Sequence, residues 1–477
     1  MTTTLIKNAA WVVAWDAGAG RHVYLNDADV AFTDGTLTHV GPSFIGTADR
    51  TIDGRGRMVM PGLVNIHAHP SSEPMSKGFM DEVGSAGLYM SSLYEYMPLF
   101  RPDPEGVKAC VLVALSELLL SGVTTVADLS MAHDGWLDIL GESGIRACVA
   151  PMYRSARWYT SNGHEVRYEW NEAAGREAFD NALRLIDLAR QHPSGRLFGM
   201  VCPAQIDTCS AELLNDSIAV ARERNVPFQL HAAQSVVEFQ EITRRHGKTP
   251  IQWLEQLGVL GPSTIIGHGI FLDHHSWVHW PTRRDLDLLA DTGTSVAHCP
   301  TVFQRRGITL QSAGAYLRRG INLGLGTDTY PHNLLEEIRS AAYLSRTTAG
   351  DVGDIRTTDL FNAATLGGAK ALGRDDIGRL APGMRADLAI VDVTLPAMRP
   401  LRDPIRSLVY AAAERAVRDV FVDGLQVVDN GRVTTLDYPA AAEALEEAQR
   451  RAESRVPGID YAGRTHLEVS PLTFDRA

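Results

Sequence analysis

The sequence has little lysine, no paired cysteine motif and no long apolar run. Lysine occurs five times in 477 residues, and none lies between Lys108 and Lys248. The five cysteines are scattered without a CxxC pair, so we expect buried thiols rather than a disulfide framework. No run approaches the ~18 apolar residues of a membrane span, and the N-terminal residues lack the pattern of a signal peptide. These absences predict a cytoplasmic protein without a membrane partner.

An excess of positive charge and a glycine-rich phosphate loop are also missing. The net charge is -12 and the isoelectric point is near 5.7, which gives no support for binding to nucleic acids or anionic membranes. A doubly wound nucleotide-binding sheet would need a glycine-rich loop after an early strand. We therefore expect a small-molecule substrate and no nucleic-acid partner.

The central part of the chain, residues 59–385, alternates helix-like and strand-like segments. The helical stretch VKACVLVALSELLLSG precedes the strand-like VTTVADLS, and similar pairs continue to INLGLGTDTY. Repeated βα units predict a parallel sheet, and this many units favour an α/β fold with a closed (β/α)8 TIM barrel. An open doubly wound sheet is the alternative.

Two β-rich segments flank this region. Residues 1–58 and 386–435 alternate apolar and polar side chains and break at Asp-Gly and Asn-Gly, which favours short strands joined by tight turns. The sequence predicts one small β-sandwich domain built from both segments. Residues 436–477 begin as an acidic helical tail, which we expect to cover the barrel or an interface of a homo-oligomer.

The most informative segment is MVMPGLVNIHAHP, residues 58–70, in which His67 and His69 lie two apart. In a strand, side chains at positions i and i+2 point the same way, so both imidazoles would share one face. Such a pair is half of a metal site, or else two solvent-facing histidines near a turn.

Other strand-like segments end in residues of the same kind. His231 ends PFQLH, His268 ends TIIGH, His298 ends SVAH and Asp328 ends LGLGTD. The catalytic groups of TIM barrels lie at the C-terminal ends of the strands, so we expect these side chains at one rim.

These motifs give the chain a resemblance to the amidohydrolase superfamily over roughly residues 5–435. The resemblance rests on PGLVNIHAHP, SELLLSGVTTVAD, LHAAQ, GHG, AHCP, GTDTYPHN, NAATLGGAKALG and IGRLAPGMRADLAIVD. It is closest to the branch that contains triazine hydrolase, cytosine deaminase and guanine deaminase. The architecture that this resemblance implies agrees with the barrel and the terminal β-domain.

The resemblance implies a role for each strand-end residue. His67, His69 and His231 are implied as metal ligands, and Asp328 as a fourth ligand that also acts as the general base. His268 is implied to lie beside the activated water and to polarise the substrate. These roles make the chain an enzyme that hydrolyses carbon–nitrogen bonds other than peptide bonds.

One divalent metal ion is expected. Family members with two ions bridge them through a carboxylated lysine on the fourth strand, and this chain has no lysine between Lys108 and Lys248. Three histidines and one aspartate suit zinc first, with Fe(II), cobalt or manganese as alternatives. We expect Cys202, on the fourth strand, to be a buried structural thiol.

The chain departs from the family pattern after the strand that carries His231. Deaminases of this branch have a proton-shuttling glutamate three residues later, where this chain has Gln234. An amide exchanges hydrogen bonds but cannot deliver a proton near pH 7. Glu238 or a water could take over, but Glu238 only if the backbone turned it inward, and we expect it on a solvated helix face. The stretches CPTVFQ and TDTYPHN also differ from the deaminase pattern.

These departures favour a mononuclear hydrolase of amides, ureas, carbamates or thiocarbamates. Attack at a carbonyl places the charge on oxygen, so these substrates depend less on a protonated ring nitrogen. Hydrolases of phenylurea and thiocarbamate herbicides belong to the same wider family. The alternative is a deaminase or dechlorinase of a triazine, pyrimidine or purine. A non-catalytic binding protein is a third hypothesis, against which the intact strand-end residues argue.

Aromatic side chains are the expected substrate contacts. Segment 153–170 is dense in aromatic residues and arginine, so it either forms a lid over the barrel mouth or packs on the barrel. The candidates for substrate binding are Tyr94, Tyr96, Trp158, Tyr159 and His298.

Overall fold

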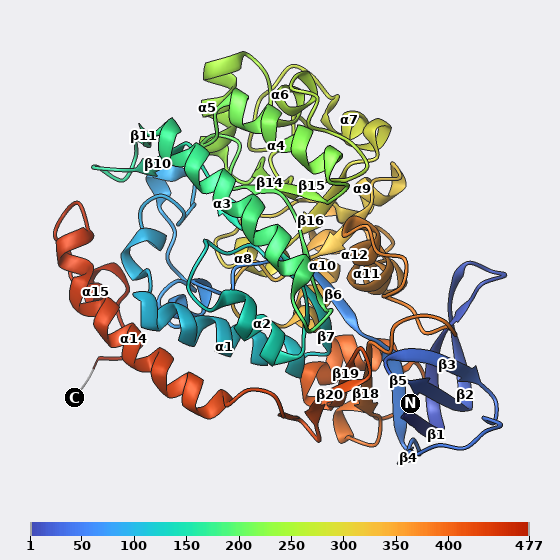
Figure 1. Cartoon of the computed structure of the whole chain (residues 1–477). Coiled ribbons are helices and arrows are strands. Elements are labelled where there is room, and N and C mark those ends of the chain that lie inside the picture. Colours follow the sequence, from blue (N-terminus) through green and yellow to red (C-terminus); the bar gives the residue numbers. More distant parts are fainter. Residues whose placement is uncertain (1, 476–477) are drawn as a thin grey trace.

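The computed structural model describes residues 2–475 (Figure 1). Strands from both ends of the chain form one nine-stranded sheet, in the order β21-β20-β19-β18-β5-β1-β2-β3, with β4 beside β1. The strands are β1 (Thr3–Asp16), β2 (Arg21–Thr33), β3 (Thr36–Gly41), β4 (Arg50–Asp53), β5 (Arg57–Pro61), β18 (Leu388–Asp392), β19 (Val417–Val422), β20 (Leu425–Asp429) and β21 (Arg432–Val433). The two ends therefore build one β-rich unit, and its description as a sandwich stays a prediction.

The alternating pattern and the tight turns explain how this sheet forms. Ile6, Val30 and Phe421 come from distant segments and are buried in the same apolar cluster. Between β2 and β3, Gly35 has a φ of 93°, which a residue with a side chain rarely adopts. A Cβ atom at Gly35 would also lie 2.5 Å from the carbonyl oxygen of Asp423, so only glycine fits this turn.

Two four-stranded parallel sheets form the central region. The first contains β12 (Leu197–Gly199), β8 (Arg146–Val149), β7 (Val123–Asp128) and β6 (Leu63–Ala68), and the second contains β14 (Phe228–Ala232), β15 (Thr264–His268), β16 (Ser295–His298) and β17 (Leu323–Leu325). Isolated parallel bridges lie at both edges: Ala68 of β6 pairs with Asp328, just beyond β17, and His231 of β14 pairs with Gln205, a few residues beyond β12. This arrangement is TIM-barrel-like, in agreement with the predicted α/β class.

Helices alternate with these strands and surround the two sheets (Figure 1). They include α1 (Pro104–Leu120), α2 (Trp136–Ser143), α3 (Glu172–Gln191), α4 (Ala211–Glu223), α5 (Val236–His246), α6 (Pro250–Gln256), α7 (Asp285–Thr292), α8 (Pro300–Gln304), α9 (Ala313–Arg318), α10 (Leu334–Ala349), α11 (Thr357–Asn362) and α12 (Gly368–Ala371). Asp103, Ser210, Ser235 and Asn333 each accept a main-chain hydrogen bond in the first turn of a helix. Such N-caps stabilise a helix by ~1 kcal/mol each.

The C-terminal tail packs on the protein's own α1. Helix α14 (Tyr438–Ile459) buries Ala448 and Ala452 in one cluster with Ala109 and Cys110 of α1. A short helix, α15 (His466–Val469), follows. Of the two positions expected for the tail, the described residues place it against the central region, and an oligomer interface stays a prediction.

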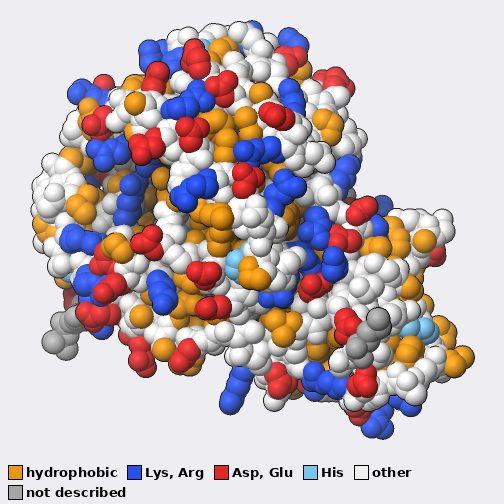
Figure 2. All heavy atoms as spheres, in the orientation of Figure 1, with side chains coloured by type: hydrophobic (Ala, Val, Ile, Leu, Met, Phe, Trp, Pro, Cys, Tyr) orange, Lys and Arg blue, Asp and Glu red, His pale blue; other side chains and the backbone are white. Residues whose placement is uncertain are grey.

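The helices, the surface charges and the cysteines agree with what the amino-acid composition predicts. Within residues 2–475, no helix is long and apolar enough to cross a membrane. Figure 2 shows acidic and basic side chains interspersed over one face of the molecule. All five cysteines are buried and free, which confirms the expectation of thiols without a disulfide framework.

Candidate metal and active site

The histidines of the HxH motif face the second parallel sheet. His67 lies near the end of β6, and its Nδ1 atom is 2.5 Å from Oε1 of Gln229 on β14. His69 follows one residue past the strand end, and its main-chain N–H donates to the carbonyl of Asp328 beyond β17. The spacing of two therefore brings both imidazoles to the space between the sheets, as the strand period predicts.

Four side chains of the kind that bind metals converge at this point: His67, His69, His231 and Asp328. One ligand atom of each lies within 4.8 Å of all the others. Nε2 of His69 is 3.1 Å from Nε2 of His231 and 3.2 Å from Oδ1 of Asp328. Nε2 of His67 is 3.5 Å from the same Asp328 oxygen. The cluster can hold a single metal ion.

The outer hydrogen bonds of the three imidazoles fit a cation at the centre. Each Nδ1 atom faces an acceptor: Gln229 Oε1 for His67 at 2.5 Å, the Leu129 carbonyl for His69 at 2.6 Å and the Ala204 carbonyl for His231 at 2.6 Å. Each ring therefore carries its proton on Nδ1 and directs the Nε2 lone pair inward. Nε2 of His67 is buried without a hydrogen-bond partner among the described residues. Inward lone pairs beside a carboxylate are the donor set of a divalent metal.

His268 completes the group from β15. Its Nε2 atom lies 3.8 Å from Oδ2 of Asp328. Burial lowers the pKa of His268 to about 3, so its imidazole is neutral near pH 7. Burial alone would raise the pKa of Asp328, but the imidazoles of His268, His67 and His69 around its carboxyl group hold it well below its ordinary value. Asp328 is thus an ionised carboxylate beside a neutral imidazole.

The backbone is unusual at these two positions. His268 has a φ of 81° and Asp328 a φ of 59°, values that residues other than glycine rarely adopt. Such conformations cost of order 1–3 kcal/mol and persist where the surrounding structure fixes them. The strand ends are therefore held in a conformation that aims both side chains at the cluster.

A cavity of about 330 Å³ opens over this cluster. His69, His231, His268 and Asp328 line its inner part. The remaining wall comes from the segment after β6, from β9 (Met152–Tyr153) and β10 (Ala156–Tyr159), from the loops after β7 and β14, and from α8 and the residues that follow it. It includes Ser72, Glu73, Met97, Phe100, Arg101, Met131, Arg154, Trp158, Gln234, Phe303 and Arg306. A cavity of this size suits a small molecule rather than a polymer.

Gln234 and Glu238 occupy different positions around this cavity. Gln234 lines the cavity, and its Nε2 atom is buried without a partner in the described part of the chain. Glu238 is fully buried, and its carboxyl oxygens accept hydrogen bonds from the main-chain N–H groups of Ala233 (2.6 Å) and Gln234 (3.3 Å). The expectation that Glu238 lies on a solvated helix face is wrong, because the turn after β14 folds its carboxyl group under that main chain.

The aromatic candidates fall into two groups. Trp158, on β10 (Ala156–Tyr159), lines the cavity, and Tyr94 packs edge-on behind it at 5.1 Å between ring centroids. The Tyr94 hydroxyl is 2.7 Å from Oγ of Ser235. Tyr159 is exposed beside Trp158 on the strand, and Tyr96 stacks on the guanidinium of Arg464; neither lines the cavity. The hairpin of β10 and β11 (Arg167–Trp170) thus contributes one aromatic wall.

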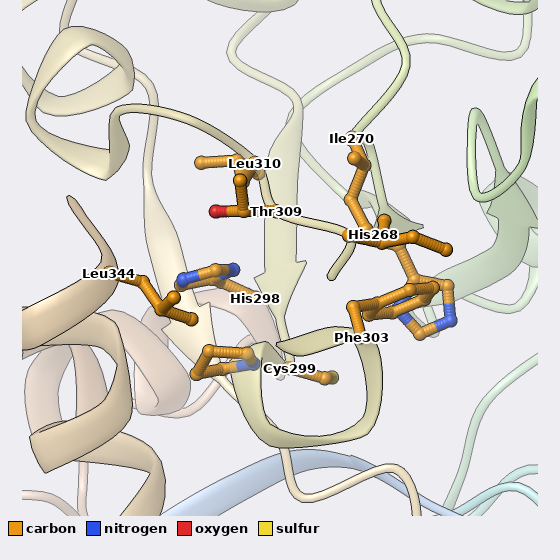
Figure 3. Close-up of a pocket in the computed structure, with 10 residues that line it drawn as sticks. His268, Ile270, His298, Cys299, Phe303, Thr309, Leu310 and Leu344 are labelled. Atoms are coloured by element: carbon orange, nitrogen blue, oxygen red, sulfur yellow. The ribbon is translucent and has the colours of Figure 1, made fainter. Parts of the chain in front are cut away.

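His298 lies in a small side pocket, shown in Figure 3. Figure 3 shows its imidazole near Leu344 and Thr309, on the other side of β16 from the His268 ring. The Phe303 ring contacts His268 edge-on at 4.7 Å and borders the same pocket. His298 is absent from the lining of the main cavity, and burial lowers its pKa to about 4.

Four further cavity or cluster residues carry no sequence prediction: Glu73, Arg101, Arg154 and Cys299. Glu73 is buried in the cavity wall, and burial raises its pKa to about 7. Cys299 forms a second close group of ligand atoms with His67 and His268, next to the first. Glu73 lies four residues after His69, and this closeness to the HxH motif is the one sequence feature that could have identified it as a site residue.

The family model described as Amidohydrolase family matches residues 58–427. The chain belongs to the amidohydrolase family. Among its relatives, 5'-deoxyadenosine deaminase of Methanosarcina mazei is 29% identical over 464 residues, which cover 96% of this chain and 100% of the relative. The 5-methylthioadenosine/S-adenosylhomocysteine deaminase of Natronomonas pharaonis is 30% identical over 429 residues, which cover 89% of this chain and 93% of the relative.

Solved structures of this amidohydrolase's relatives agree in fold. An adenosine deaminase from Xanthomonas campestris with bound zinc has a TM-score of 0.80 and 26% identity, and the match covers 95% of this chain and 99% of the other. Atrazine chlorohydrolase from Arthrobacter aurescens, complexed with zinc, has a TM-score of 0.78 and 24% identity, and the match covers 94% and 100%. The second similarity shows the fold alone.

These matches confirm the resemblance stated from the motifs. The chain is a hydrolase of the amidohydrolase family, acting on carbon–nitrogen bonds other than peptide bonds. Its histidine and aspartate cluster can hold one metal ion, and both solved structures named above contain zinc. Cys202 belongs to no metal-binding group among the described residues and is buried in an apolar cluster.

Proposed function

We propose that this amidohydrolase is a mononuclear metal-dependent aminohydrolase that removes an amino group from an N-heterocycle, with aminopurine nucleosides as the first candidates. The observation that carries the proposal is the cluster of His67, His69, His231 and Asp328 at the inner end of the cavity, with His268 beside it. The names of the deaminase relatives support the choice of substrate class. This choice follows the alternative from the sequence rather than the amide and urea hypothesis.

The proposed roles follow from position and protonation. A zinc ion in the cluster would supply a nucleophile near neutral pH by lowering the pKa of water. Asp328, ionised and 3.2 Å from His69, accepts the proton of that water and delivers it to the departing amine. His268, a neutral imidazole, orients the nucleophile against the heterocycle.

Gln234 is proposed to hold the heterocycle. Gln234 lines the cavity and its Nε2–H has no partner among the described residues, so it could donate to a ring nitrogen of the substrate, which is an acceptor of the right kind. Because an amide cannot transfer a proton, the ring nitrogen takes its proton from water in this proposal.

Gln234 also supports a second candidate function, hydrolysis of an amide, urea, carbamate or thiocarbamate. Attack at such a carbonyl places charge on oxygen and needs no protonated ring nitrogen, so a glutamine would suffice. The two functions differ in the product, because deamination releases ammonia and carbonyl hydrolysis releases an amine or aniline.

The decisive experiment is a substrate panel with zinc-reconstituted enzyme. The panel contains 5'-deoxyadenosine, adenosine, guanine, cytosine and a chlorotriazine, together with a phenylurea, an anilide and a thiocarbamate. We expect ammonia from an aminopurine and none from Asp328→Asn. Amine or aniline release would favour the second candidate. Metal binding without any turnover would favour a binding protein.

Several expectations about the whole chain are also proposals. We infer a closed (β/α)8 barrel over residues 59–385, a β-sandwich from residues 1–58 and 386–435, and a helical tail over residues 436–477. The bridge between Ala68 and Asp328 supports closure of the barrel. We further propose a cytoplasmic homo-oligomer with a small-molecule substrate.

A further inference from the structure

Gln229 contacts one of the histidines of the cluster from the opposite sheet. It lies on β14, two residues before His231, and is fully buried. Its Oε1 atom is 2.5 Å from Nδ1 of His67 on β6, and its Nε2–H group donates to the carbonyl of Ile66 at 3.0 Å. One amide from the second parallel sheet therefore contacts two successive residues of the first sheet.

His67 differs in this contact from the other two histidines of the cluster. Nδ1 of His69 faces the main-chain carbonyl of Leu129 at 2.6 Å. Nδ1 of His231 faces the main-chain carbonyl of Ala204, also at 2.6 Å. A main-chain carbonyl is present whatever residue occupies its position, so a substitution there keeps the acceptor. The acceptor for His67 belongs to a side chain, which a substitution can remove.

The surroundings of Gln229 fix which way its amide points. Its Nε2 atom faces two acceptors, the Ile66 carbonyl at 3.0 Å and Sδ of Met200 at 3.5 Å. The reversed amide would place Oε1 against the Ile66 carbonyl oxygen, so two acceptors would meet in a buried position. Oε1 therefore faces His67. Because an amide oxygen only accepts hydrogen bonds, the imidazole carries its proton on Nδ1.

A second acceptor competes for this proton on the opposite side of the ring. Oδ1 of Asp328 lies 3.5 Å from Nε2 of His67. A ring with its proton on Nε2 would donate toward this oxygen and would no longer offer a lone pair to a metal ion. The contact with Gln229 opposes this tautomer, because it stabilises the proton on the other nitrogen.

We propose that Gln229 is a positioning residue that keeps the proton of His67 on Nδ1 and thereby keeps Nε2 available to the metal ion. The inference rests on the part of the proposed function that assigns a metal ion to the cluster, and it does not depend on the substrate. Loss of an outer partner of a metal ligand typically weakens metal binding about 10–100-fold. Because Gln229 reaches from β14 to β6, it also links the strands that carry His231 and His67.

The first test observes the tautomer in the full chain after treatment with a chelator. Nitrogen NMR of protein labelled in its histidines distinguishes a proton on Nδ1 from one on Nε2, and His67→Gln identifies the signal. The wild type should show His67 with its proton on Nδ1. Gln229→Met fills a similar volume but removes the acceptor, so the Nε2–H tautomer should increase. Gln229→Glu keeps an acceptor and should retain the Nδ1–H tautomer.

The second test measures zinc affinity by competition with a chelator, which needs no turnover. Gln229→Met should weaken zinc binding about 10–100-fold, and Gln229→Glu should restore most of this loss. Gln252→Met is the matched control, because Gln252 is also buried and donates to Thr282 and Asp285, outside the cluster. This control should lower the melting temperature without a change in zinc affinity.

The outcomes separate this inference from the proposed function. If Gln229→Met shifts the tautomer and weakens zinc binding but the wild type deaminates no heterocycle, the positioning role stands and the proposed function fails. A proton on Nε2 of His67 in the wild type would overturn the inference without any variant. A lower melting temperature of Gln229→Met with unchanged zinc affinity, as in Gln252→Met, would also overturn it, because Gln229 would then support packing alone.

Discussion

Gln234 is the residue on which the choice between the two candidate functions depends, because it carries an amide where a glutamate would carry a carboxyl group. Its amide lines the cavity, and its Nε2 atom has no hydrogen-bond partner within residues 2–475. Glu238, four residues later, has its carboxyl oxygens on the main chain of Ala233 and Gln234. At the residue scale, Glu238 shapes the turn while Gln234 lines the cavity.

Gln234→Ala should lower kcat on the true substrate by less than about tenfold, since one neutral hydrogen bond contributes ~1 kcal/mol. Steady-state kinetics at saturating substrate check this value. Gln234→Glu is the matched variant, and it should preserve or raise deamination because a carboxyl group can exchange a proton. A loss of several thousandfold in Gln234→Ala would mean that the side chain takes a direct part in proton transfer.

Metal content is the second prediction at this scale. Elemental analysis of zinc-loaded protein should find one ion per chain, because His67, His69, His231 and Asp328 form one compact donor set. Chelation should abolish hydrolysis, and zinc should restore it. His69→Gln should lose the ion, whereas His298→Gln, altered in the side pocket, should keep it. Two tightly held ions per chain would contradict the mononuclear site.

At the scale of elements, helices α8 and α10 are joined by a buried carboxyl group. Glu337 on α10 accepts a hydrogen bond from the main-chain N–H of Thr301 in the first turn of α8, at 3.0 Å. Burial raises the pKa of Glu337 to about 8. Phe303 of α8 packs on His268, so this contact positions one wall of the site.

The raised pKa of Glu337 predicts a pH dependence of stability. The folded state holds this proton up to about pH 8, whereas the unfolded chain releases it near pH 4.5. The contribution of protonated Glu337 to the free energy of unfolding is therefore complete below pH 4.5. It is lost as the pH rises toward 8, by at most about 1.4 kcal/mol per pH unit. Urea unfolding of Glu337→Gln between pH 5 and 8 should show a flatter profile than the wild type. A profile parallel to the wild type would contradict a protonated Glu337.

At the scale of the whole molecule, the C-terminal tail fixes the segment that forms one side of the cavity. Gln449 of α14 donates hydrogen bonds to the carbonyls of Met75 and Lys77, at 2.9 Å each. Arg464 bridges Glu95 (2.8 Å) and Asp460 (2.7 Å). The tail and the segment after β6 are therefore one unit, although some 370 residues separate them along the chain.

Arg464→Met should loosen this unit. The substitution leaves the buried carboxylate of Glu95 without its cation, which should lower the free energy of unfolding by about 1–3 kcal/mol. It also removes a contact that positions the cavity wall containing Glu73 and Arg101. Thermal unfolding should show a lower Tm, and KM should rise several-fold with a smaller change in kcat. The control is Arg450→Met, whose exposed pair with Glu447 lies on the outer face of α14. An unchanged KM would show that the tail acts on stability alone.

The sequence by itself determined which side chains form the cluster that can bind a metal ion, because their positions follow the period and the ends of the strands. His67 and His69 share a face through the strand period, and strand-end residues such as His231 and Asp328 must meet where parallel strands end together. The tertiary structure alone decided what the other side chains do. Glu238 turned inward because of a tight turn after β14, His298 turned to a side pocket, and loops distant in sequence came together as the wall of one cavity. Loop side chains follow no period, so their direction depends on packing that the folded chain alone establishes.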